Sequence, residues 1–126
     1  HCGQKKALDG CEVMCLDTYI SKHGIQRVDV IKMDVDGFEC DILRGASRMI
    51  KECQPAIVME LCPYALEENG SSLEEMLDIL YSENYHLELV DNGNSLFNDP
   101  DKMRKMFPEG SSVNIVARYR KDGSQL

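Results

Sequence analysis

The fold is decided by residues 28–46, which read Val-Asp-Val-Ile-Lys-Met-Asp-Val-Asp-Gly-Phe-Glu-Cys-Asp-Ile-Leu-Arg-Gly-Ala. Residues 28–35 are rich in β-branched side chains and are followed by Asp36-Gly37, a pattern that predicts a strand and then a tight turn. The apolar residues that follow recur at three- and four-residue spacing, so they predict one helix over 38–53. The segment is therefore predicted to be a strand, an acidic turn and a helix.

The alternation of strand and helix continues along the chain. Residues 56–61 form an apolar run that predicts a strand covered on both faces, and Ser72 is placed to cap a helix over 73–83. The other predicted elements are a strand at 11–16, a helix at 17–23, a loop at 62–71, a strand at 86–91, a helix at 100–107 and a strand at 113–119. Strands joined by helices predict an α/β fold with a mostly parallel sheet and flanking helices, in one domain over 1–126 with a frayed tail at 122–126.

Composition argues against several classes of function. The chain has 126 residues, the length of one domain, with 22 acidic residues, 14 basic residues and a net charge of −8. Such an acidic chain is not expected to bind nucleic acid, and no apolar run approaches the roughly 20 residues of a membrane span. The six cysteines lack a C-x-x-C pair and predict reduced structural thiols, with disulfides or metal binding as alternatives. We expect a cytoplasmic protein.

The spacing of the glycines excludes the common glycine-rich nucleotide-binding motifs. No two of the nine glycines lie closer than seven residues apart. The chain therefore contains neither G-x-G-x-x-G nor a phosphate-binding Walker loop. By itself it has no glycine-rich turn to hold a dinucleotide, a nucleotide phosphate or a nucleoside cofactor.

Acidic residues fall at the predicted strand ends. Asp34 lies near the end of the first strong strand, Asp36 and Glu39 flank Gly37 in the turn, and Glu60 lies at the end of the next strand. If the two strands are parallel neighbours, these carboxylates converge on one edge of the sheet, where α/β proteins bind ligands. They could then take a proton from a substrate hydroxyl or hold a substrate amine.

Simpler interpretations of the same residues stay open. Asp36 and Glu39 could simply stabilise the start of a helix, where negative charge is favourable. Glu60 could simply be the last residue of a strand. A metal site is the weaker alternative, because carboxylates could supply ligands but no histidine lies nearby in the sequence.

Residues 32–46 resemble the signature of FkbM-type methyltransferases, a class I family that uses S-adenosylmethionine. That signature is an apolar strand ending in Lys-x-Asp-x-Glu-Gly-x-Glu, followed by a helix with Leu-x-Gly-Ala. The chain departs from it at Asp36, where the family has Glu. Supporting similarities are Leu16-Asp17-x-Tyr19, residues 55–61, Tyr85 and residues 113–118.

The resemblance implies transfer of a methyl group from S-adenosylmethionine to a hydroxyl group of a small molecule or a glycan. It implies that Asp34 is catalytic and contacts the cofactor, and that Glu60 is catalytic. It also implies that Asp36, Glu39 and Glu60 face the acceptor substrate, and we expect no metal at this site. A carboxylate would orient the hydroxyl and remove its proton as the methyl group moves.

The resemblance further implies that the chain is the C-terminal part of a Rossmann-like, seven-stranded domain, truncated at its N-terminal side. The other half would carry the first strand, the glycine-rich turn after it and the acidic residue that holds the ribose. The cofactor pocket would then be incomplete, and this chain alone would be inactive. The lack of any G-x-G motif agrees with this implication.

Two other functions are considered. The chain could be a non-catalytic α/β interaction module, or a degenerate methyltransferase-like domain, whose exposed sheet edge pairs with another chain or with a second copy. A flavodoxin-like receiver domain is the weaker alternative. Acidic residues recur at strand ends in such domains, but the order of the elements matches poorly.

Overall fold

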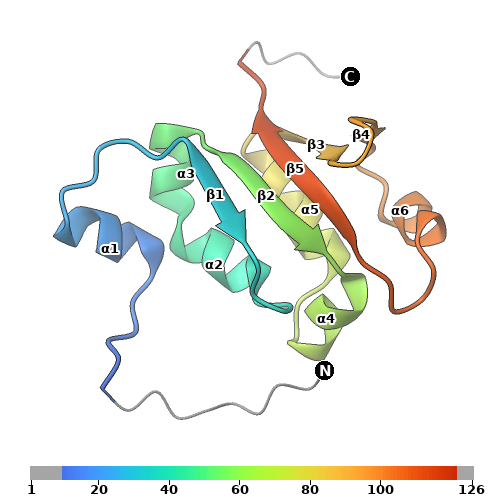
Figure 1. The fold of residues 1–126 in the computed structure, drawn as a ribbon, viewed down its shortest axis with the longest axis horizontal. Coiled ribbons are helices and arrows are strands. Elements are labelled where there is room, and N and C mark those ends of the chain that lie inside the picture. Colours follow the sequence, from blue (N-terminus) through green and yellow to red (C-terminus); the bar gives the residue numbers. More distant parts are fainter. Residues whose placement is uncertain (1–9, 122–126) are drawn as a thin grey trace.

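The computed structural model, which describes residues 10–121, contains one five-stranded sheet (Figure 1). The strands are β1 (Val30–Met33), β2 (Ala56–Leu61), β3 (Tyr85–Leu89), β4 (Ser95–Leu96) and β5 (Val113–Tyr119). The helices are α1 (Leu16–Lys22), α2 (Glu39–Gly45), α3 (Ser47–Cys53), α4 (Pro63–Glu68), α5 (Leu73–Ser82) and α6 (Pro100–Met106). The predicted α/β class is confirmed, whereas the predicted frayed tail at 122–126 lies outside the described residues.

The sheet is mixed, so the predicted mostly parallel sheet is wrong. The strands lie in the order β1-β2-β5-β3-β4, and within residues 10–121 only β1 and β2 form a parallel pair. The last strand, β5, lies between β2 and β3 and is antiparallel to both, and β4 is antiparallel to β3. The strands β1, β2 and β3 therefore run in one direction, but β5 separates β3 from β2. Local hydrophobicity could not reveal this order, because it reports burial and not the identity of the neighbouring strand.

One face of the sheet is packed against helices, and we call it the covered face. It carries Met33, Ile57, Met59, Leu87 and Ile115, which are between 0% and 4% exposed. These side chains share one core cluster with apolar residues from α2, α3 and α5. In Figure 1, these three helices lie behind the strands. Burying such side chains contributes about 1.5–3 kcal/mol each relative to leaving them exposed, so this layer stabilises the fold.

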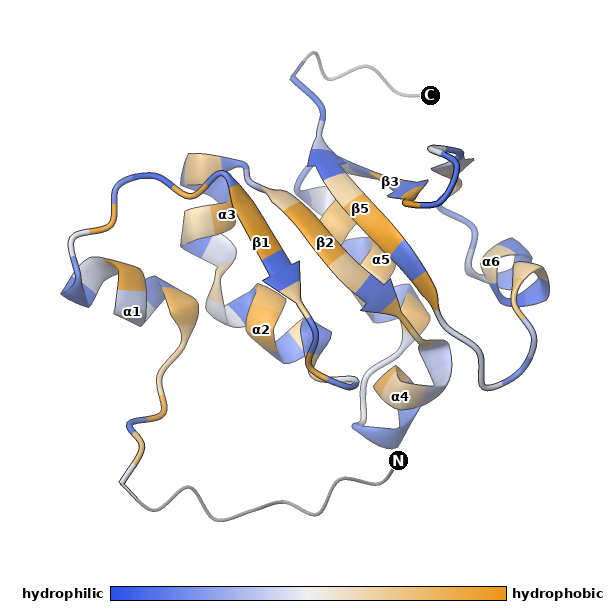
Figure 2. Cartoon of the chain, in the orientation of Figure 1, coloured by the Kyte–Doolittle hydropathy of each residue, from blue (hydrophilic) through white to orange (hydrophobic). Residues whose placement is uncertain are grey.

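The opposite face, which we call the open face, carries Val30, Lys32, Val58, Glu60 and Asn114. Val30 is 61% exposed, and along β2 the residues of this face are half-buried or exposed while their neighbours are buried. The prediction that residues 56–61 are covered on both faces is therefore wrong within the part of the chain that the structure describes. Figure 2 shows hydrophilic residues towards the ends of β1, β2 and β5.

The helix predicted over 38–53 is two helices, α2 and α3, which meet at Ala46. The carboxylate of Asp17, in α1, accepts hydrogen bonds at 2.9 Å from the backbone N–H groups of both Arg48 and Met49. It therefore caps the first turn of α3, whose N–H groups have no partner within the helix. The cap comes from a residue distant in sequence, so the periodicity of 38–53 could not predict the break.

Several local predictions also have clear outcomes. The predicted strand at 11–16 is wrong, because α1 begins at Leu16 and residues 11–15 have no regular structure. The predicted loop at 62–71 contains α4, which begins at Pro63. The predicted cap of α5 is confirmed, because Ser72 Oγ accepts a hydrogen bond from the Glu75 N–H at 3.1 Å.

Two further properties concern residues 10–121 only. The cysteines at 11, 15, 40, 53 and 62 are free thiols. The longest helix, α5, has ten residues, and none of the helices has the length and apolar composition that a bilayer crossing requires.

Candidate active site at the carboxyl ends of β1 and β2

The parallel pairing of β1 and β2 brings two acidic side chains together. Met33 pairs with Met59, so the next residues of the two strands, Asp34 and Glu60, lie at the same end of the sheet. Both line a hollow of about 70 Å³ on the open face, which we call the strand-end hollow. Asn114 of β5 lines it from the other side of β2. The hollow therefore presents two carboxylates and an amide at one point.

The two carboxylates of the hollow have different partners. Lys32 Nζ lies 3.5 Å from Asp34 Oδ2, and these side chains are 74% and 64% exposed. Glu60 Oε1 accepts a hydrogen bond from the Ser112 hydroxyl. Among residues 10–121, no further hydrogen bond or ion pair engages the other oxygen of either carboxylate. Each group is thus oriented through one oxygen and can interact with a ligand through the other.

The turn after β1 is held against α4. Asp36 and Gly37 both have positive φ, 48° and 99°, and the Asp36 carbonyl accepts a hydrogen bond from Asn69 Nδ2 at 3.0 Å. A Cβ atom at Gly37 would overlap the carbonyl oxygen of Ala65, so only glycine fits there. This close approach fixes the path of the chain that leaves Asp34.

The other two predicted acidic residues do not line the hollow. Glu39 is only 5% exposed, and its Oε1 accepts a hydrogen bond from the Gly37 N–H at 3.3 Å. It closes the turn from the inside, so its geometry is that of a supporting residue. The Asp36 side chain is exposed at the turn. Contact of Asp36 and Glu39 with an acceptor stays a prediction.

Comparison with known protein families shows which family this chain belongs to. The sequence profile of the methyltransferase FkbM domain matches residues 10–87. The chain belongs to the FkbM methyltransferase family. The match runs from before α1 into β3, so it contains Asp34, the turn and Glu60. Comparisons with curated proteins and with solved structures give no match.

Two residues beside the candidate site were missed by sequence reasoning. Ser112 and Asn114 belong to the segment that leads into and begins β5, beyond the matched range, yet they contact Glu60 or line the hollow. The available signal was a pair of polar residues at the start of an apolar strand. That signal acquires meaning only when β5 is known to lie beside β2.

The strand-end hollow of this FkbM domain is small compared with a pocket that encloses a ligand. The family implies a methyl donor, but a hollow of about 70 Å³ is well below the roughly 300–1,000 Å³ of pockets that enclose ligands. Around it, residues 10–121 provide carboxylates and an amide, and no glycine-rich turn. These residues alone therefore do not enclose the donor.

Proposed function

We propose that this chain supplies one wall of an S-adenosylmethionine-dependent O-methyltransferase site, with Asp34 on the donor side and Glu60 on the acceptor side. The proposal rests on one observation above the others. In a chain of the FkbM family, Asp34 and Glu60 line one exposed hollow at the carboxyl ends of two parallel neighbouring strands. Ligands of open α/β sheets bind at such an edge.

The chain's own residues position and deprotonate the acceptor. When bound, the donor supplies a methyl group whose bond to sulfur breaks, with the electron pair staying on sulfur, as the bond to the acceptor oxygen forms. Glu60, held through Oε1 by Ser112, takes the hydroxyl proton on its other oxygen. Asp34, held by Lys32, orients the reacting groups from the adjacent strand.

We propose that the donor pocket is completed by further strands and helices of a Rossmann-like domain. The first support is the position of β1, whose only partner among residues 10–121 is β2, so its other edge is unpaired there. The second is the open face, on which Val30 is 61% exposed. On this account residues 1–126 form the C-terminal part of the domain and are inactive alone.

The unpaired edge of β1 also favours a second function. An exposed strand edge presents N–H and C=O groups to any partner strand. A non-catalytic module could pair this edge with another chain or a second copy, and the small volume of the strand-end hollow agrees with that function.

Isothermal calorimetry with S-adenosylhomocysteine separates the two functions. We compare residues 1–126 with the same chain preceded by the upstream sequence of its gene. Binding by the longer protein only is the expected result. Binding by neither protein supports the non-catalytic module and contradicts the methyltransferase, and binding by residues 1–126 alone contradicts the incomplete pocket.

A further inference from the structure

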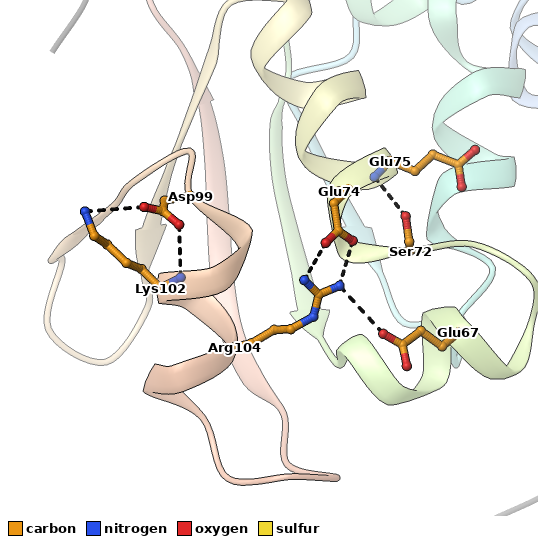
Figure 3. A network of polar contacts seen from close by, with 7 residues as sticks. All are labelled: Glu67, Ser72, Glu74, Glu75, Asp99, Lys102 and Arg104. Carbon is orange, nitrogen blue, oxygen red and sulfur yellow. Dashed lines mark hydrogen bonds and ion pairs between the residues drawn. The ribbon is translucent and has the colours of Figure 1, made fainter.

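A cavity of about 290 Å³ is lined by residues of α4, of α6 and of the segment 107–111, and we call it the α4–α6 cavity. Arg104 of α6 bonds the carboxylate of Glu74 through both terminal nitrogens, one of them at 2.6 Å, and its Nη2 lies 3.7 Å from Glu67 Oε1 (Figure 3). This network joins α6 to α4 and α5, so it holds two walls of the cavity together. The volume is close to the lower limit for small-molecule sites, so the cavity suits a compact ligand.

The turn that follows α6 places a second carboxylate in the lining. The backbone N–H and the hydroxyl of Ser111 both donate hydrogen bonds to the Pro108 carbonyl, at 3.0 and 2.6 Å. Gly110 has a φ of 74°, the left-handed conformation that glycine adopts readily in such turns. Glu109 therefore lies in a closed four-residue turn at the cavity. Within residues 10–121, its carboxylate forms no hydrogen bond or ion pair.

The charges of the lining favour a cation. Two carboxylates, Glu67 and Glu109, line the cavity together with one guanidinium, Arg104. That guanidinium already bonds Glu74, so it offers little attraction to an anion. A neutral ligand would displace water from the two carboxylates without replacing its interactions, which is unfavourable. A cation compensates for this loss, so a positive charge suits these walls.

The other walls of the cavity indicate the kind of cation. Tyr64 and Phe107 are aromatic, and the negative face of an aromatic ring attracts a cation. Pro63 and Pro108 add apolar surface without a backbone N–H. A metal ion needs several ligands, and the described part of the chain holds no group of three His, Cys, Asp or Glu residues that could supply them. A primary ammonium is strongly hydrated and donates three hydrogen bonds, whereas a fully methylated ammonium donates none.

We propose that the α4–α6 cavity binds a small molecule that carries a quaternary ammonium group. The ammonium group lies against Tyr64 and Phe107, and Glu67 and Glu109 balance its charge. Among the described residues, the cavity shares no lining residue with the strand-end hollow. Binding here goes beyond the proposed methyl transfer and does not depend on it.

Two pairs of variants locate the binding. Glu109→Gln removes a lining charge and should weaken the binding of choline about fivefold, whereas Glu52→Gln, an exposed carboxylate on α3 outside the cavity, should leave it unchanged. Tyr64→Leu removes an aromatic face but keeps apolar surface, so it should weaken the binding by about threefold to tenfold. Phe97→Leu is its control, because Phe97 is 70% exposed and does not line the cavity. Equal affinities of each variant and its control would contradict the site.

The test itself is a titration of nitrogen-15-labelled residues 1–126 with choline chloride at constant ionic strength. The matched probes are 3,3-dimethyl-1-butanol, which has a similar shape without the charge, and ethanolamine, which carries a primary ammonium. We expect choline to shift the amide signals of residues 64–67 and 109–111, and to bind about tenfold more tightly than either matched probe. No shift with choline, shifts confined to other residues, or equal or tighter binding of a matched probe would overturn the proposal.

Discussion

The two faces of the sheet show how one strand serves two purposes. Along β2, Ile57 and Met59 are 0% and 1% exposed on the covered face, while Glu60 is exposed on the open face. Successive side chains of a strand point to opposite faces, so neighbouring residues can have unrelated roles. The covered face stabilises the domain, and the open face carries the candidate chemistry. Substitutions on the two faces should therefore affect different measurements.

The largest expected effect is on catalysis, from the open face. In the longer protein, Glu60→Gln should lower turnover about 10²- to 10⁴-fold, because an amide cannot accept the hydroxyl proton. The rate of labelled methyl transfer from S-adenosylmethionine to a hydroxyl acceptor measures this turnover. Glu52→Gln, an exposed carboxylate on α3, is the control and should leave turnover unchanged. Normal turnover in the Glu60→Gln protein would contradict a role of the open face in the reaction.

The next effect is on stability, from the covered face. Ile57→Ala should lower the free energy of unfolding by about 2–5 kcal/mol, because Ile57 is fully buried. Val58→Ala, its half-buried neighbour on the open face, should cost under about 1 kcal/mol. Urea denaturation of both variants measures the difference. Equal losses would show that the open face is also packed.

A third effect is on stability and concerns the turn after β1, which belongs to neither face. Gly37→Ala should lower the free energy of unfolding by about 3 kcal/mol, because φ is 99° and the new Cβ overlaps Ala65. At Gly24, φ is 62° but no atom lies within 4 Å, so Gly24→Ala should cost only about 1 kcal/mol. Thermal and urea unfolding of the pair test whether the packing of the turn on α4 matters beyond backbone strain.

The smallest expected effect on stability comes from an ion pair in the helical layer. Hydrogen bonds from Arg104 lower the pKa of Glu74 from 4.5 to about 2. Because the folded pKa is the lower one, the pair stabilises the protein above about pH 4.5 and loses this contribution as the pH falls towards 2. The side chains of Arg104 and Glu74 are 35% and 48% exposed, so solvent weakens the pair. Glu74→Gln should therefore lower the free energy of unfolding by less than about 1 kcal/mol at pH 7. Urea denaturation should show a difference from the unsubstituted protein that shrinks as the pH falls from 4.5 towards 2, and a difference that does not shrink over this range would contradict the ion pair.

Local patterns predicted what depends on local forces. The strands at 56–61 and 113–119 match residue for residue, because a short apolar run with β-branched residues has few other stable arrangements. The convergence of Asp34 and Glu60 followed from assuming that two strands joined by helices are parallel neighbours, which β1 and β2 are.

Contacts between distant residues could not be predicted from the same patterns. Ser112 binds Glu60 across 52 positions in the chain, because β5 returns to lie beside β2. Asp17 ends the predicted single helix by capping α3 from α1. Burial of Glu39 was equally hidden, since its acidic side chain suggested an exposed site residue. Each of these depends on which segments meet in three dimensions.

The most direct measurement of the central claim is the affinity of the longer protein for S-adenosylhomocysteine when Asp34 is changed. Asp34 lines the strand-end hollow, so Asp34→Asn should weaken binding by about tenfold or more, as expected when a hydrogen bond to a charged group is lost. Glu52→Gln should leave the affinity unchanged. Calorimetry that finds the same affinity for Asp34→Asn and for the unsubstituted protein would contradict the assignment of this edge to the methyl-donor site.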